Sequence, residues 1–260
     1  MKIVVCVKQV PDTETRVKVA PSGNAISETD VANWIPSPYD EFAIEEAIRI
    51  KEAKGGEVVL VTVGPERAQA ALRTGLAMGA DSAVHVKDAA LDGADTLGTA
   101  RALAAAVRTL APFDLVLCGQ QGIGGDNSQI PGMLAELLDL PQVTVAVKIE
   151  IGDGRAVVER EADGGRETWE TPLPAVVSAQ KGLNEPRYAS LKGIMAAKKK
   201  PIQAVDLSAL GLDAAAVAPR VTVSALELPP ARPPVKMIEG DPATQASELI
   251  RLLHEEAKVI

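Results

Sequence analysis

Short runs of apolar, mostly β-branched residues alternate along this chain with longer segments in which apolar residues recur at helical spacing. The short runs show little polar alternation, which is typical of strands buried on both faces of a parallel sheet. We expect strands at Ile3–Val7, Val58–Val63, Ser82–Val86, Leu115–Leu117 and Val143–Val147, and helices at Pro38–Ala53, Ala68–Met78, Thr96–Leu110 and Asn127–Leu138. This order predicts an α/β fold, a mostly parallel sheet with helices on both faces.

The pattern changes after about residue 148. Val157–Glu161 and Pro174–Ser178 flank a Gly164-Gly165 turn, and we expect them to form an antiparallel edge hairpin. Residues 201–235 are rich in Ala and Pro and have no strong period, whereas Asp241–Lys258 is expected to form a helix capped by Asp241. Such a tail buries little of its own surface, so we expect a long C-terminal arm that packs on a partner subunit.

Charge and composition restrict the classes of partner. The 260 residues include 27 Lys and Arg against 35 Asp and Glu, and the net charge of −8 argues against broad binding to nucleic acids or anionic membranes. Phe, Trp and Tyr occur only twice each, too few for an aromatic platform that stacks on single strands. No apolar run approaches about 18 residues, and we expect a soluble, cytoplasmic protein.

The metal-binding and redox-active residue types are sparse. Cys6 and Cys118 both lie within apolar runs and not in a metal-type spacing, so we expect buried strand residues in a reducing compartment. The only histidines are His85 and His254. We therefore expect no metal site.

The most informative segment is Gly119–Gln129, GQQGIGGDNSQ, which follows a predicted strand and precedes a predicted helix. Glycines allow backbone amides to approach an anion, and the first turn of a helix offers unpaired N–H groups at the positive end of its dipole. In open parallel sheets, ligands bind at the carboxyl ends of the strands, here at Lys8, Val63 and Gly119. The segment is thus a candidate phosphate-binding loop.

A structural interpretation of the same loop stays open. Asp126 and Gln129 have the spacing of an N-capping arrangement, and glycines are common in connections before helices. The loop matches neither GxGxxG nor GxxxxGK[ST]. Elsewhere, the charged strand around Glu161 and the lysines at Lys198–Lys200 could simply be solvated surfaces, and Leu191 could be buried under a loop instead of being an exposed anchor.

The sequence resembles the beta (small) subunits of electron-transfer flavoproteins over essentially its whole length. The motifs that carry the resemblance, in order, are Ile3–Pro11, Pro38–Glu52, Leu72–Asp81, Gly119–Gln129, Val158–Ala179 and Asn184–Lys200. The resemblance implies an adenine-nucleotide-binding, α/β-hydrolase-like fold in residues 1–200 and an arm in residues 201–260 that wraps the alpha subunit. It also implies an electron carrier and not an enzyme, with no catalytic residue in this chain.

The cofactors implied by the resemblance are one redox-active FAD, held mainly by the alpha subunit, and a structural AMP in this chain. Tyr39 would lie near the isoalloxazine edge of the FAD. The residues that would surround the nucleotides are Cys6, Ser37, Pro38, Tyr39, Asp40, Val63, Gly119, Gln120, Gln121, Gly122, Ile123, Gly124, Gly125, Asp126, Asn127, Ser128, Gln129 and Ile130.

The resemblance also implies how electrons enter and leave. A recognition loop, residues 184–200, would place Leu191 into a pocket of an acyl-CoA dehydrogenase or similar flavin dehydrogenase of fatty acid oxidation, and a membrane quinone oxidoreductase would accept the electrons. Glu161 matches the carboxylate that governs the swing of the flavin domain. The residues expected to contact partners are Tyr188, Leu191, Ile194, Met195 and Glu161.

Some positions depart from the family pattern and leave alternatives. Ser128 replaces an asparagine, Pro131 replaces a glycine and Trp169 replaces an aliphatic residue. An electron-bifurcating branch of the family holds a second FAD where AMP would lie; we favour AMP. A stand-alone ATP-binding enzyme would need a glycine-rich loop after the first strand, where Lys8–Asp12 has none, and a nucleotide-sensing module would not need the long tail.

Overall fold

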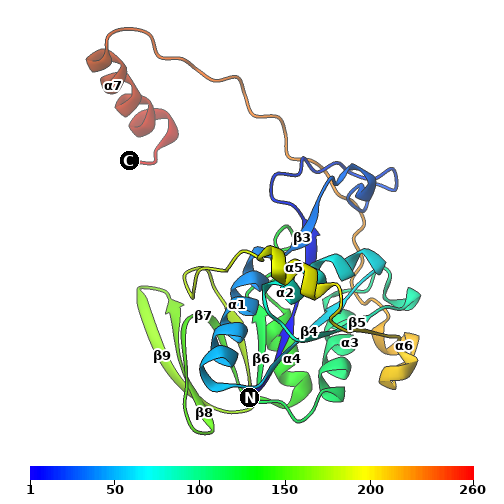
Figure 1. Ribbon diagram of the computed structural model, residues 1–260. Coiled ribbons are helices and arrows are strands. Elements are labelled where there is room, and N and C mark those ends of the chain that lie inside the picture. The colour runs from blue at the N-terminus through cyan, green and yellow to red at the C-terminus, as the bar shows by residue number, and fades with distance from the viewer. The chain divides into compact units, whose positions relative to one another are not determined.

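The computed structural model describes residues 1–260, which form two compact units, Met1–Leu226 and Glu227–Ile260. The first unit contains a nine-stranded sheet in the order β11-β5-β4-β1-β6-β10-β7-β8-β9 (Figure 1). Its strands are β1 (Lys2–Cys6), β4 (Glu57–Val63), β5 (Ser82–Val86), β6 (Leu115–Gly119), β7 (Gln142–Ile151), β8 (Arg155–Ala162), β9 (Gly165–Pro172), β10 (Ala175–Ala179) and β11 (Ile202–Val205). The strands from β11 to β7 pair in parallel, whereas β8 and β9 extend the sheet antiparallel. The predicted fold class is confirmed.

Helices cover both faces of the parallel part. The helices of the first unit are α1 (Pro38–Lys54), α2 (Gln69–Met78), α3 (Thr96–Thr109), α4 (Ile130–Leu138), α5 (Leu191–Ala197) and the short α6 (Ala214–Val217). Alternate residues of β1 point to opposite faces: Ile3 and Val5 pack with α1 and α2, and Val4 and Cys6 with α3 and α4. Because both faces of these strands are apolar and covered, the hydrophobic core has two layers.

The predicted antiparallel hairpin is partly wrong. β8 does run antiparallel at the edge, but its hairpin partner is β9, Gly165–Pro172. The segment expected at Pro174–Ser178 is instead β10, which lies inside the sheet between β6 and β7 and is parallel to both. All five residues of β10, AVVSA, are buried, while β9 carries charged, exposed residues, so burial places the apolar run in the interior and the polar run at the edge.

Other boundaries also differ. The helix expected from Asn127 begins at Ile130, because the preceding residues form an irregular loop. The pattern missed a short antiparallel pair, β2 (Gln9–Pro11) with β3 (Trp34–Pro36), and it missed α5. It also missed β11, which pairs with β5, and α6, although Leu207 and Val217 in this region are buried against the sheet.

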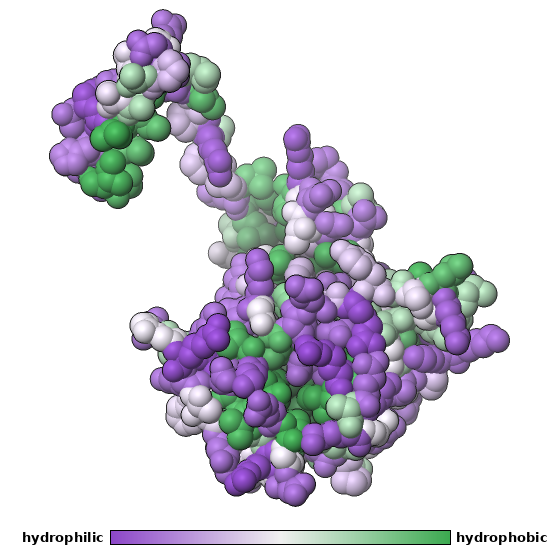
Figure 2. Space-filling model, turned by 60° about the vertical axis from the view of Figure 1, so that its left-hand side comes forward, coloured by the Kyte–Doolittle hydropathy of each residue, from purple (hydrophilic) through white to green (hydrophobic).

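The second unit contains α7 (Pro242–Arg251), which continues as a π-helical segment (Leu252–Ala257). Asp241 caps α7 by accepting hydrogen bonds from the N–H groups of Ala243 and Thr244, and Pro242 occupies its first turn, as predicted. Leu249, Ile250, Val259 and Ile260 are exposed, and Figure 2 shows apolar surface gathered on this helix. None of the helices in the chain combines the length and apolar character needed to cross a membrane.

Candidate functional site

A cavity of about 340 Å³ opens at the carboxyl ends of β1, β4 and β6. Three strand ends meet there because parallel strands all finish at the same edge of the sheet. The cavity is lined by Cys6, Val7, Lys8, Asp40, Val63, Ala94, Asp95, Thr96, Thr99, Leu103, Cys118, Gly119, Gln120, Gln121, Gly122, Gly125, Asp126, Asn127, Ser128, Gln129, Ile130 and Pro131. The lining therefore combines apolar residues at the strand ends, polar residues at the starts of α1 and α3, and the glycine-rich loop.

Asp40, in the first turn of α1, connects the strand ends beneath the cavity. Its carboxylate accepts hydrogen bonds from the backbone N–H groups of Lys8, at 2.7 Å, and of Gly119, at 2.9 Å. A Cβ atom at Gly119 would lie 2.4 Å from Oδ1 of Asp40, so only glycine fits there. Ser37, just before α1, donates from its hydroxyl to the carbonyl of Gln121 at 3.2 Å.

Asp40 is buried in this arrangement. Burial raises the pKa of its carboxyl to about 7, although the two backbone hydrogen bonds and the charge of Lys8 act in the opposite direction. A buried carboxylate is costly unless it is hydrogen-bonded. The two backbone N–H groups therefore make Asp40 tolerable at this position and fix the N-terminus of α1 against β6.

The loop before α4 has an unusual backbone. Asp126 and Ser128 have left-handed φ values of 49° and 52°, and Gly124 has a φ of 86°. Alternation of left- and right-handed residues turns successive N–H groups toward one side and forms an anion-binding concavity. The backbone N–H groups of Asn127, Ser128, Gln129 and Ile130 donate to no group of the chain. These four residues line the cavity next to the positive end of α4, so their N–H groups are available as donors there.

Side chains brace the same loop. Gln121 donates from Nε2 to Oδ1 of Asp126 at 2.8 Å, and its Oε1 accepts from the hydroxyl of Ser128 at 2.8 Å. Asp126 thus bonds to Gln121 and not to the helix, and the residue at the N-cap of α4 is Gln129. The N-capping interpretation of Asp126 is therefore wrong.

The apolar wall contains both cysteines. Cys6 and Cys118 are direct register partners on β1 and β6, and both are buried, as predicted. Contact with Cys6 and burial raise the pKa of the Cys118 thiol well above its ordinary value, so this thiol is neutral. With Val63 and Leu103, the two cysteines give the cavity an apolar surface that suits a heteroaromatic base.

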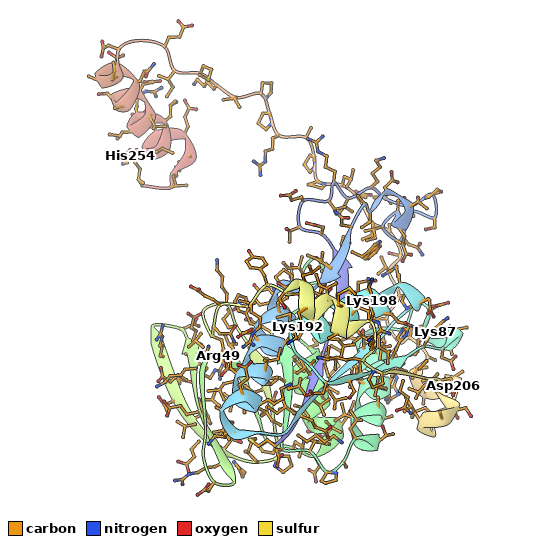
Figure 3. The ribbon with its side chains drawn as sticks, viewed as in Figure 1. Arg49, Lys87, Lys192, Lys198, Asp206 and His254 are labelled. Carbon is orange, nitrogen blue, oxygen red and sulfur yellow. The ribbon has the colours of Figure 1, made fainter.

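A second feature is a set of exposed apolar side chains on α5 and just before it. Tyr188 is 99% exposed, Leu191 78%, Met195 58% and Ile194 44%. Ser190 caps the helix by accepting a hydrogen bond from the N–H of Gly193 at 3.0 Å. Lys192 and Lys198 mark the two ends of α5 in Figure 3. Four large, solvent-exposed apolar side chains in a single short segment are typical of a protein-binding site.

Comparison with known proteins identifies the family. The family model described as "Electron transfer flavoprotein domain" matches residues 26–210. The chain belongs to the electron transfer flavoprotein family. It is 44% identical to the electron transfer flavoprotein subunit beta of Bacillus subtilis over the whole of both chains, and 41% identical to that of Syntrophomonas wolfei over all of this chain and 98% of the relative. The protein of that name from Mycobacterium tuberculosis is 42% identical over 81% of each chain.

The matches confirm the resemblance found in the sequence. The relatives are beta subunits of electron transfer flavoproteins, so this chain is a beta subunit with a role in electron transfer, and the family is associated with a flavin. The family is one of electron carriers.

The structure brings most of the predicted nucleotide residues of this flavoprotein subunit together. The exceptions do not line the cavity; they are Ser37, Pro38, Tyr39, Ile123 and Gly124. Ser37 supports the loop from behind through Gln121, while Pro38 lies in a separate shallow hollow with Phe42, Pro186 and Tyr188. Glu161 is exposed on β8, outside the cavity.

Sequence reasoning missed several lining residues. Lys8 lies two residues after the end of β1; the sequence placed it at a ligand-binding strand end, but it was not among the residues expected around the nucleotide. Asp95, Thr96 and Thr99 lie at the start of α3, where Asp95 caps the helix by accepting from the N–H of Gly98 at 2.8 Å. The DGADT segment is a recognisable helix start, but nothing in the pattern placed it opposite the glycine-rich loop.

Proposed function

We propose that this subunit pairs with an electron transfer flavoprotein alpha subunit, holds AMP in the cavity and completes the environment of an FAD bound mainly by alpha. The heterodimer would carry electrons from acyl-CoA dehydrogenases, or similar flavin dehydrogenases, to a membrane quinone oxidoreductase. The observation that supports AMP best is the row of unused N–H groups from Asn127 to Ile130 at the start of α4. Such donors suit a phosphate in a protein of net negative charge.

The rest of the cavity fits the same ligand. The apolar wall around Cys6, Val63 and Cys118 would hold the adenine base. The buried Oε1 atom of Gln120 has no hydrogen-bond partner within the chain, and an amino or hydroxyl group of the nucleotide would satisfy it. Asp126 to Ile130 would hold the ribose and phosphate, and Gly122, Gly124 and Gly125 add no Cβ atoms to the loop.

The FAD would supply all the redox chemistry, while this chain would supply position and shielding. We propose that Tyr39, beside the buried Ser37 and Asp40, covers the isoalloxazine edge against water. No residue of this chain needs to act as an acid, base or nucleophile for electron transfer.

Partner contacts complete the proposal. Leu191, with Tyr188, Ile194 and Met195, would enter an apolar pocket of the dehydrogenase, and Glu161 would influence the position of the flavin domain. Small exposed anchors suit transient docking because they allow fast release. Within the arm of residues 201–260, the second unit, Glu227–Ile260, would contact alpha, with the exposed apolar face of α7 covered in the heterodimer.

The nucleotide content of the purified heterodimer tests this proposal. The two subunits are co-expressed, the complex is denatured and every released nucleotide is quantified by chromatography. We expect one FAD and one AMP per heterodimer. Two FAD and no AMP would replace the proposal with the electron-bifurcating alternative, and a complex without AMP or a second FAD would contradict the assignment of the cavity.

Electron transfer is tested with the same complex. Its FAD should be reduced by an acyl-CoA dehydrogenase in the presence of the acyl-CoA substrate, as followed by flavin absorbance. Leu191→Ala should raise the KM for the heterodimer by about tenfold or more, because anchors in desolvated pockets contribute most of the docking energy. A heterodimer that no flavin dehydrogenase reduces would contradict the proposed function.

A further inference from the structure

The segment that leads into the exposed anchors is tied to α1 by one arginine. Nε and Nη2 of Arg187 donate to the two carboxylate oxygens of Glu45 at 2.8 and 3.0 Å, and the backbone N–H of Arg187 donates to the same carboxylate at 3.1 Å. Nη1 and Nη2 also donate to the two oxygens of Glu52 at 2.6 and 2.9 Å. Both pairs are bidentate, which fixes the guanidinium plane as well as its charge.

The two carboxylates have different surroundings. The side chain of Glu45 is only 5% exposed, whereas that of Glu52 is 54% exposed. A buried carboxylate needs a positively charged partner, so the pair with Glu45 fixes the position of the Arg187 side chain. Glu52 then adds a second pair on the solvent side, and hydrogen bonding to Arg187 lowers the pKa of its carboxyl. In Figure 3, Arg49 marks the part of α1 that lies between these two glutamates.

Further contacts hold both sides of the anchors. Before them, Nδ2 of Asn184 donates to the carbonyl of Phe42 at 3.0 Å and to Glu46 at 2.9 Å, again on α1. After them, Nη1 of Arg73 on α2 donates to the carbonyls of Ala197 and Lys200 at 2.6 and 2.8 Å.

Helix α5 itself lies directly on α2. A Cβ atom at Gly193 would lie 2.4 Å from the carbonyl oxygen of Ala77, so the two helix backbones approach closely there. The anchors therefore lie on a segment that is fixed at each end, while their own side chains are uncovered.

We propose that Arg187 is a positioning residue that holds residues 188–197 in the shape required for docking to the flavin dehydrogenase. This inference rests on the proposed function. Ordering a loop and its side chains on binding costs free energy, and a segment already fixed by α1 avoids that cost. Arg187 acts through the anchors: its guanidinium group is paired with Glu45 and Glu52, so it contributes to docking without needing a contact to the partner.

The test uses the heterodimer with FAD bound and compares Arg187→Gln, Arg187→Lys and Glu52→Gln with the wild type. Arg155→Gln is the matched control, because Arg155 forms a surface pair with Glu170 at 2.9 Å on the β8–β9 hairpin, with both side chains about 60% exposed. Amide hydrogen exchange of residues 188–197 measures order. Reduction of the FAD by an acyl-CoA dehydrogenase with octanoyl-CoA gives kcat and the KM for the heterodimer.

Arg187→Gln should speed exchange in residues 188–197 and raise the KM about tenfold, with kcat changed by less than about twofold, because only preorganisation is lost. Arg187→Lys should recover part of both effects, since it keeps the charge but not the bidentate geometry. Glu52→Gln leaves the buried pair with Glu45 intact, so this variant should fold normally. It should also speed exchange in residues 188–197 and raise the KM, but by less than Arg187→Gln.

Three results would overturn the inference. Exchange in residues 188–197 that is unchanged in all three variants would show that Arg187 does not order the segment. Faster exchange with an unchanged KM would show that its order is irrelevant to docking. A wild-type heterodimer that the dehydrogenase does not reduce would remove the proposed function and this inference together, whereas the first two results leave the proposed function intact.

Discussion

The carboxylate of Asp40 accepts a hydrogen bond from the backbone N–H of Gly119 at 2.9 Å, although the two residues are 79 positions apart in the chain. The same carboxylate accepts from the N–H of Lys8 at 2.7 Å. One side chain in the first turn of α1 thus joins the ends of β1 and β6, the two central strands that lead into the cavity. The geometry of the nucleotide site depends on this junction.

Gly119→Ala should damage the junction. The added Cβ would lie 2.4 Å from Oδ1 of Asp40 and 2.7 Å from the backbone of Tyr39 and Asp40. We expect the heterodimer to lose about 1–3 kcal/mol of stability, the usual cost of overpacking, and to retain less AMP. Urea unfolding and nucleotide quantification measure both effects. Gly165→Ala is the control, because no atom lies within 4 Å of its added Cβ; equal behaviour of the two variants would contradict the prediction.

Asp40→Asn should change the pH dependence of stability. Burial raises the pKa of Asp40 in the folded protein to about 7 from 3.8. The protonated carboxyl therefore contributes fully to the free energy of unfolding below about pH 4, and this contribution is lost as the pH rises to and through about 7. At about 1.4 kcal/mol per pH unit, the loss is at most about 4 kcal/mol. The free energy of unfolding of wild type minus variant, measured from pH 4.5 to 8 in urea, should therefore fall with rising pH. A difference that is constant or rises between pH 4.5 and 8 would show that the pKa of Asp40 is not raised in the folded protein.

Lys8→Met should weaken binding of AMP but not of adenosine. The Nζ atom of Lys8 lies 2.9 Å from the position that a Cβ of Gly122 would take and 3.5 Å from that of Gly125, so its ammonium group lies over the phosphate loop. We expect the affinity for AMP to fall about tenfold, as for loss of an exposed charged contact, with adenosine unchanged. Calorimetry on the nucleotide-depleted heterodimer measures both. Lys54→Met, at the far end of α1, is the control, and an equal loss for adenosine would argue against a phosphate contact.

Cys6 and Cys118 should be unreactive in the folded heterodimer. Both thiols are buried between β1 and β6, and the pKa of Cys118 is raised by the contact with Cys6 and by burial. Because the thiolate is the reactive form, we expect alkylation by iodoacetamide at pH 8 to be at least about tenfold slower than in the urea-unfolded chain. Removal of AMP should speed it, since both residues line the cavity. Mass spectrometry of the labelled peptides measures the rates. Rapid labelling of either thiol in the AMP-loaded complex would contradict the prediction that both are unreactive.

The periodicity of apolar residues was sufficient to predict the positions of those helices and strands that bury a continuous apolar face. β1, β4, β5, β6 and α1 to α3 lie where the apolar spacing predicted them, and their order gave the parallel sheet. The pattern failed at β10, where an apolar run near a charged hairpin was assigned to the edge. Only the packing of AVVSA between β6 and β7 shows that it is interior, because local spacing carries no information on which strands pair.

The sequence by itself determined the fold class, the two buried cysteines and a glycine-rich loop at a strand end, since each depends on residues close together in the chain. Tertiary structure alone decided that Asp40 joins β1 to β6, that Asp126 and Ser128 adopt left-handed conformations in the loop, and that Arg187 pairs with Glu45 and Glu52. These contacts join residues as many as 142 positions apart. Their partners are set by how the helices pack on the sheet, and a local pattern of apolar and charged residues does not specify that.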